Sequence, residues 1–226
     1  MSCIEIDGIR ITVTRKNIKN LHLYVKPPDG EVKITAPLFV STQMISAFAR
    51  SRAQWITQRR AELRERTRAE KAGYENGAIR YIWGRPLRLR AEKGERTCVT
   101  EAGDELMVSL SGEITPEKTA EALKAWYREK LSERIARRMP YWEERTGLRC
   151  SAWQIRDMKT RWGSCSTATG KIRINLLLAQ KDAECLDYVI VHELAHLKQA
   201  DHGACFKALL DSYMPGWREV RKRLNG

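Results

Sequence analysis

Three of the four histidines in this chain lie between positions 192 and 202. In the run His192-Glu193-Leu194-Ala195-His196, two imidazoles are four residues apart. On a helix this spacing places them on one face, one turn apart, where both can bind the same ion. Neutral imidazole suits Zn²⁺, while Ni²⁺ and Mn²⁺ remain open. The spacing therefore predicts a metal site on a helix.

Glu193 follows the first of these histidines directly. From a helix it can reach a water molecule on the metal without binding the metal itself, and it can accept that water's proton as a general base. His202 comes six residues after His196, so the helix must end between them for a third imidazole to turn back. Three imidazoles leave a fourth position for water or substrate, which is typical of a catalytic zinc site.

The same motif can also arise by chance on a surface helix. Here the flanking residues are apolar, among them Val189, Ile190 and Leu197, so the helix is expected to be buried. Buried histidines and a buried glutamate need partners, which a metal ion and its water would supply. Two downstream acids, Asp211 and Glu219, compete with His202 as third ligand.

Several predicted elements must position this helix, which Asp182 is expected to cap. Thr115 followed by Pro116 predicts the start of a long helix that ends at Gly147. The remaining predictions are strands over Gln154–Cys165 and Lys171–Ala179, and closing helices over Ala204–Tyr213 and Trp217–Leu224.

The first half of the chain is rich in short β-prone runs. A hairpin is predicted around Pro27–Gly30, and it contains the fourth histidine, His22, as a surface residue. One helix is expected from Ser41 or Thr42, and strands return between Ile79 and Leu110. We therefore predict an α+β protein with a β-rich region with one helix over 1–112 and a metallohydrolase domain over 113–226.

Composition limits the remaining classes. The 226 residues are 42% hydrophobic and carry a net charge of +13, which favours contact with polyanions such as nucleic acid or nucleotides. No run of 18 apolar residues occurs, and the N-terminal stretch lacks the apolar segment of a leader, so no membrane contact is expected. Six cysteines without a C-x-x-C pair fit free thiols in the cytoplasm. The oligomeric state is left open.

Taken together, several motifs resemble the YgjP-like metal-dependent hydrolases, a zincin-like group related to SprT-like and WLM proteases. The resemblance extends over nearly the whole chain. The segments that carry it are His192–Leu197, Asp201–Gly203 with Phe206, Lys159–Ser166, Lys26–Pro37, Trp55-Ile56 and Tyr81–Arg85.

The resemblance implies a zincin-like, minigluzincin-like catalytic domain with a mixed sheet packed against the metal helix and an N-terminal β-rich region. It also implies His192, His196 and His202 as ligands and Glu193 as base. The spacing to the third histidine equals that of metzincins, but Gln199 stands where those proteins have glycine.

The substrate is the open part of the prediction. The family is usually regarded as peptidase-like, which implies a metallopeptidase, but nucleoside-triphosphate pyrophosphohydrolase activity on UTP has also been associated with it. A nucleic-acid-associated protease or binding protein is a further alternative, based on the basic surface. Arg161 could bind a phosphate or a carboxylate, and Ser164 is a second candidate for substrate contact.

Overall fold

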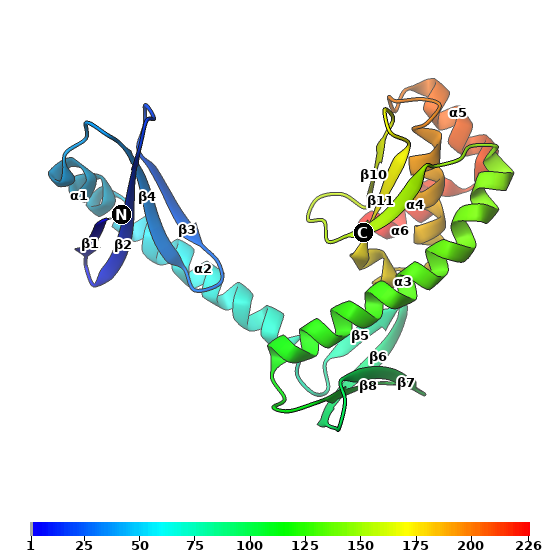
Figure 1. Ribbon diagram of the computed structural model, residues 1–226, viewed down its shortest axis with the longest axis horizontal. Coiled ribbons are helices and arrows are strands. Elements are labelled where there is room, and N and C mark those ends of the chain that lie inside the picture. Colours follow the sequence, from blue (N-terminus) through cyan, green and yellow to red (C-terminus); the bar gives the residue numbers. More distant parts are fainter. Residues whose placement is uncertain (1) are drawn as a thin grey trace. The chain divides into compact units, whose positions relative to one another are not determined.

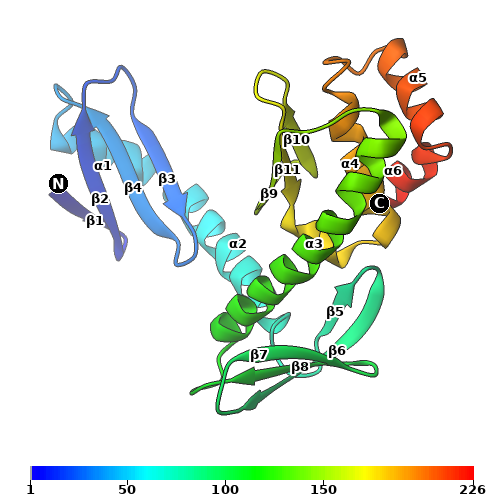
Figure 2. The ribbon, with the colours of Figure 1, turned by 45° about the vertical axis from the view of Figure 1, so that its right-hand side comes forward.

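The computed structural model describes residues 2–226, which Figures 1 and 2 show from two directions. Its helices are α1 (Thr42–Ser51), α2 (Ala53–Ala72), α3 (Pro116–Thr146), α4 (Ala183–Ala195), α5 (Ala204–Tyr213) and α6 (Trp217–Asn225). Its strands are β1 (Ser2–Ile6), β2 (Ile9–Lys16), β3 (His22–Lys26), β4 (Glu31–Pro37), β5 (Ile79–Ile82), β6 (Arg85–Lys93), β7 (Cys98–Ala102), β8 (Glu105–Leu110), β9 (Ala152–Arg156), β10 (Gly163–Ser166) and β11 (Lys171–Asn175). The predicted α+β class is thus confirmed.

The chain forms two compact units, the first ending at Ala72 and the second covering Gly73–Gly226. In the N-terminal unit the strand order is β1-β2-β4-β3, with β2 and β4 parallel and the other neighbours antiparallel. The predicted hairpin is confirmed as the β3–β4 pair. Sheet and helices share one apolar core, to which Ile34, Ile45 and Ile56 belong.

The second unit contains two sheets. The order β5-β6-β8-β7 repeats the strand order and directions of the N-terminal sheet. In the smaller sheet, β10-β11-β9, the central strand runs antiparallel to β10 and parallel to β9. Helix α3 contacts strands of both sheets and also α4. A single core therefore joins Leu89 of β6, Leu131 of α3, Ile174 of β11 and Leu194 of α4.

The units divide at Ala72 rather than at residue 112, where the sequence predicted the boundary. The sequence assigned β5–β8 to the N-terminal region because those strands resemble the preceding ones in pattern. In the structure, Leu89 and Leu106 are buried in the same core as α3 and α4. Apolar packing thus joins this sheet to the unit that holds the histidine helix.

Two local predictions also differ from the structure. The helix predicted from Ser41 is two helices, because the chain turns at Arg52 between α1 and α2. The strand predicted over Lys171–Ala179 stops at Asn175, and a short 3-10 helix covers Leu176–Gln180. The side-chain oxygen of Asn175 accepts a hydrogen bond from the backbone N–H of Leu177, at 3.1 Å. This bond caps the 3-10 helix and ends the strand.

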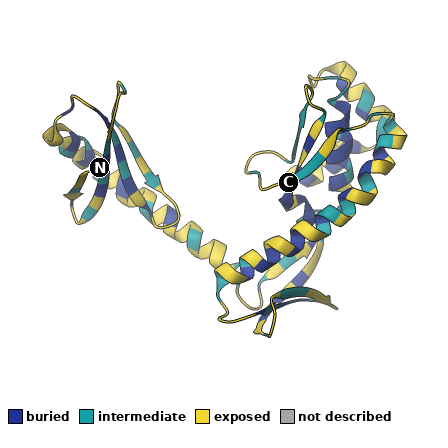
Figure 3. Ribbon diagram, in the orientation of Figure 1, coloured by how far each residue is buried: buried dark blue, intermediate teal, exposed yellow. Residues whose placement is uncertain are grey.

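Burial differs sharply between the helices (Figure 3). Nine of the 13 residues of α4 are buried, whereas α2 buries only Ile56 and Leu63 and exposes most of its charged side chains. Within residues 2–226, no helix combines the length and the apolar character that a bilayer crossing requires.

Candidate metal centre

Helix α4 brings the histidine motif into the core of the second unit. Its apolar residues fix its orientation, because Ile190 and Leu194 are fully buried against the sheet and α3. Asp182 occupies the predicted cap position, but its carboxylate makes no capping bond and instead lies 3.2 Å from the Arg223 guanidinium. The helix ends at Ala195 with His196 as its C-cap residue, slightly before the end that the sequence predicted between His196 and His202, so the chain can turn back toward the last turn of α4.

The three histidines of the motif meet at their Nε2 atoms. The Nε2 atom of His192 lies 3.2 Å from that of His196 and 3.1 Å from that of His202. Ligand atoms about 2.05 Å from a tetrahedral zinc ion lie about 3.3 Å apart, so these Nε2–Nε2 distances fit a single zinc ion bound by all three histidines. Three ring nitrogens so close together cannot all be satisfied by protons shared among themselves, whereas a cation between them satisfies every lone pair.

The environment favours the unprotonated histidines that bind metals. Burial lowers the pKa of His192 to about 3, with further lowering by His196, His202 and Arg221. Burial also lowers the pKa of His196. The other ring nitrogen of His196, Nδ1, lies 3.1 Å from the carbonyl oxygen of Gln199, an arrangement that orients metal-binding imidazoles.

Glu193 is 4% exposed and packs against strand β10. A side-chain carbon at Gly163 would lie 2.5 Å from its Oε1 atom, so only glycine leaves room for the carboxylate there. The group that approaches Gly163 is therefore the carboxylate of Glu193. Burial raises the pKa of Glu193 to about 8 in the metal-free protein, and the charge of Arg161 opposes this shift.

A cavity of about 580 Å³ opens over these groups. It brings together every predicted site residue: His192, Glu193, His196, His202, Arg161 and Ser164. The competing ligands lie elsewhere. Asp211 accepts hydrogen bonds from Trp217 and Arg218, and neither Asp211 nor Glu219 lines the cavity.

Among the other residues that line the cavity, Tyr188, Arg221 and Asn225 carry polar groups that sequence reasoning missed. Tyr188 could have been found, because it precedes His192 by one helical turn and so shares its face. Its ring contacts that of His192 edge-on, with centroids 5.7 Å apart. The other two come from α6, and no local pattern signals that this helix packs beside α4.

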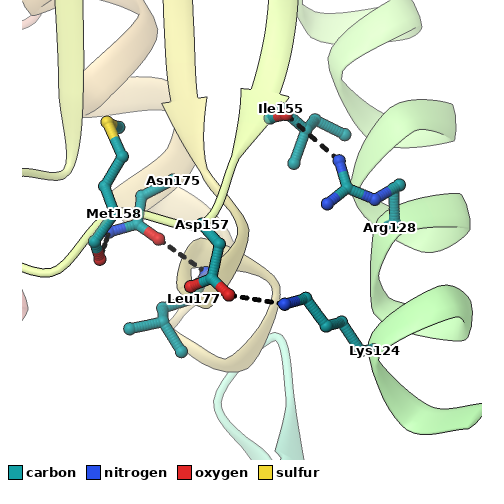
Figure 4. Close-up of polar contacts among 7 residues, drawn as sticks. All are labelled: Lys124, Arg128, Ile155, Asp157, Met158, Asn175 and Leu177. Atoms are coloured by element: carbon teal, nitrogen blue, oxygen red, sulfur yellow. Dashed lines mark hydrogen bonds and ion pairs between the residues drawn. The ribbon is translucent and has the colours of Figure 1, made fainter. Parts of the chain in front are cut away.

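Asn175 is another missed residue, and it holds the segment that carries Arg161. Its buried side-chain nitrogen donates to the carbonyl oxygens of Met158, at 2.9 Å, and Arg161, at 2.7 Å. Figure 4 shows Asn175 beside Met158 and Leu177, with α3 supplying Lys124 to Asp157 nearby. One buried amide thus fixes a loop at the edge of the cavity.

Replacing Asn175 by Asp is expected to destabilise the protein by about 1–3 kcal/mol, because two carbonyl oxygens lose their donor. The acceptor for the Leu177 N–H is kept, so the loss of stability reports on the two hydrogen bonds to the loop of Met158 and Arg161. Denaturant unfolding measures it, and Asn20→Asp, at an exposed position, is the matched control. Equal unfolding free energies for Asn175→Asp and the unmodified protein would contradict this role.

A helix that carries His192 and Glu193 and is capped by His196, a third histidine beyond its end, and a mixed sheet alongside define a zincin-type metallohydrolase. The family model described as "YgjP-like, metallopeptidase domain" matches residues 19–226, so the chain belongs to the YgjP-like family. Its domain is accordingly a metallopeptidase-type, metal-dependent hydrolase domain, as the resemblance implied. A comparison with curated proteins gives no match.

Two solved structures are similar to part of the chain. One is the metallopeptidase zymogen of Pyrococcus abyssi abylysin, at 23% identity and a TM-score of 0.37, covering 40% of this chain and 90% of that one. The other is the metallopeptidase zymogen of Methanocaldococcus jannaschii jannalysin, at 27% identity and a TM-score of 0.37, covering 40% of this chain and 93% of that one.

Proposed function

We propose that this chain is a zinc-dependent peptidase in which His192, His196 and His202 bind the metal and Glu193 is the general base. The proposal depends on one observation: the Nε2 atoms of His196 and His202 lie 3.2 and 3.1 Å from that of His192, beside a buried carboxylate. Neutral imidazoles favour zinc, while use of Ni²⁺ or Mn²⁺ stays open.

In this mechanism, a bound zinc ion would polarise the scissile carbonyl and lower the pKa of the attacking water. Glu193 accepts the proton of that water at a carboxylate oxygen and then donates it to the leaving amine nitrogen. Gly163 keeps the carboxylate in place by leaving no side chain in its way. His202, at the exposed end of the site, completes the ligand set.

Strand β10 supports a peptide as the substrate. It lies at the edge of the β10-β11-β9 sheet, and its residues Gly163, Ser164 and Cys165 line the cavity. The backbone groups of an edge strand on the side away from β11 can pair with an extended peptide. We therefore propose that Ser164 and Arg161 contact the substrate, with the peptide backbone running along β10.

Metal removal tests the proposal together with its nucleotide alternative. Zinc-loaded protein is expected to cleave a disordered protein substrate, to lose this activity after chelation, and to regain it with one zinc ion per chain. A panel of nucleoside triphosphates that includes UTP is assayed in parallel. Metal-dependent pyrophosphate release from UTP without peptide cleavage would replace the peptidase by the pyrophosphohydrolase.

Two broader predictions remain with this proposal: a cytoplasmic location and contact with nucleic acid. Residues 1–72 contain 14 Lys and Arg against 7 Asp and Glu. This excess of seven positive charges is more than half of the net charge of +13. If this surface binds nucleic acid, the affinity falls steeply with added salt and is unaffected by chelation of the metal. Affinity that does not depend on salt argues against it.

A further inference from the structure

The cavity over the metal centre is lined by two arginines that form no ion pair with a carboxylate of the described residues. Its described lining contains Arg161 and Arg221 against a single acid, Glu193, which is buried. Arginines that line a cavity without an ion-pair partner are available for carboxylate or phosphate groups of a ligand.

The nine residues of helix α6 include both paired and unpaired arginines. Arg218 is paired with Asp211, and Arg223 is paired with Asp182 and Glu184. Among the described residues, no acid lies within ion-pair distance of Arg221, and its guanidinium makes no hydrogen bond with the protein. Of these three arginines, the unpaired one is the one that lines the cavity.

Aromatic packing holds Arg221 beside the metal ligands. Trp217, one turn earlier on α6, stacks on Tyr188 with ring centroids 6.1 Å apart and planes 3° from parallel. Tyr188 in turn contacts His192 edge-on. Burial lowers the pKa of His192 and raises that of Tyr188, and in both cases the charge of Arg221 acts to lower the pKa, as expected for a guanidinium close to both rings.

Arg161 lines the same cavity from the loop between β9 and β10. Its backbone is held by Asn175, and the adjacent Trp162 donates from Nε1 to Oδ1 of Asn225, at 3.1 Å. Asn225 lies one turn beyond Arg221 on α6. The loop that carries Arg161 and the helix that carries Arg221 are therefore directly connected, and both arginines border the space above Glu193.

We propose that Arg161 and Arg221 form a carboxylate-binding subsite beside the metal, so that the peptidase prefers substrates with a carboxylate next to the scissile bond. This inference rests on the proposed peptidase function and names its substrate class. The carboxylate can belong to an Asp or Glu side chain or to a peptide C-terminus, since the planar guanidinium binds both in the same bidentate way.

Binding to the zinc-loaded Glu193→Gln protein tests the subsite without turnover. Labelled peptides are compared in matched pairs, Asp against Asn, Glu against Gln, and free against amidated C-terminus, by fluorescence anisotropy. Charged hydrogen bonds contribute about 1.5–3 kcal/mol, so the acidic member is expected to bind about 10- to 100-fold more tightly. The side-chain pairs and the terminal pair separate the two sources of carboxylate.

Substitution then assigns the preference to the arginines. Adding Arg161→Gln or Arg221→Gln is expected to remove most of the preference for the acidic member of each pair. Lys222→Gln is the matched control, because it removes the same charge from the same helix at a position that does not line this cavity. Both arginines are exposed, so each variant is expected to fold, and thermal unfolding checks this.

The subsite is refuted if acidic and neutral peptides bind equally, if the preference survives both arginine substitutions, or if Lys222→Gln reduces it as much. Tight binding of UTP with no binding of acidic peptides also overturns it. Failure of the peptidase proposal is distinguishable, since the unmodified enzyme would then cleave no peptide, whatever the binding preference of the Glu193→Gln protein.

Discussion

The Glu193→Gln variant is expected to keep its zinc ion and to lose about 10²–10⁴-fold in kcat for peptide hydrolysis, the range that general acid–base catalysis contributes. The amide has nearly the same shape as the carboxylate, so it fits the space that Gly163 leaves open. It cannot take a proton from water, however, so the step assigned to Glu193 is lost. KM should change little, because the carboxylate is buried and transfers protons rather than binding the peptide.

Steady-state kinetics and metal analysis of the same preparations check this prediction. Glu219→Gln is the control, since it removes one carboxylate from an exposed position of α6 outside the cavity. If Glu193→Gln retains full activity with bound zinc, another group is the base. If it loses zinc along with activity, Glu193 acts in metal binding and the division of roles in this site is wrong.

The histidine helix could be predicted because its information is local. Spacing of four residues sets a shared helical face, and apolar neighbours such as Ile190 indicate burial. The caps of α3 are local as well: the N–H of Lys118 donates to Thr115 Oγ1, at 3.3 Å, and Gly147 adopts the left-handed conformation. The β3–β4 hairpin was predictable for the same reason, since a short turn determines the pairing of its two strands.

The division into units depends on packing between distant segments, and here the boundary at Ala72 differs from the predicted one at residue 112. The segments of β5–β8 are short β-prone runs like those of β1–β4, so their local pattern gave no reason to separate them. Their assignment is decided by Leu89 and Leu106, which share a core with α3 and α4. No alternation of polar and apolar residues along a strand specifies which helix will cover it.

The outer part of the site was unpredictable for a related reason. Arg161 and Ser164 were candidates because they precede the histidine helix in a recognisable segment, whereas Arg221 is one of three arginines on α6. Its position in the cavity follows from the stacking of Trp217 on Tyr188, a contact between two helices. Asn175 was read only as a strand residue. It is the last residue of β11, and its side-chain amide also caps the following 3-10 helix and holds the Arg161 segment.

Replacing His202 by Ala is expected to lower the zinc affinity by more than about 100-fold, the upper end of the cost of losing a partner that only orients a ligand. His202 is the exposed member of the cluster and lies beyond the end of α4, so its loss should leave the helix and its core intact. The unfolding free energy of the metal-free protein should therefore change by no more than about 0.5 kcal/mol, as for other surface substitutions.

Competition with a chromophoric chelator measures the affinity, and His22→Ala is the control because it removes the remaining histidine from the N-terminal unit. An unchanged affinity in His202→Ala would reopen the choice of third ligand. Asp211 would then have to give up Trp217 and Arg218, its present hydrogen-bond donors, to reach the metal. Because those bonds also hold Trp217 against Tyr188, a switch to Asp211 would disturb the packing beside His192, which makes His202 the physically simpler ligand.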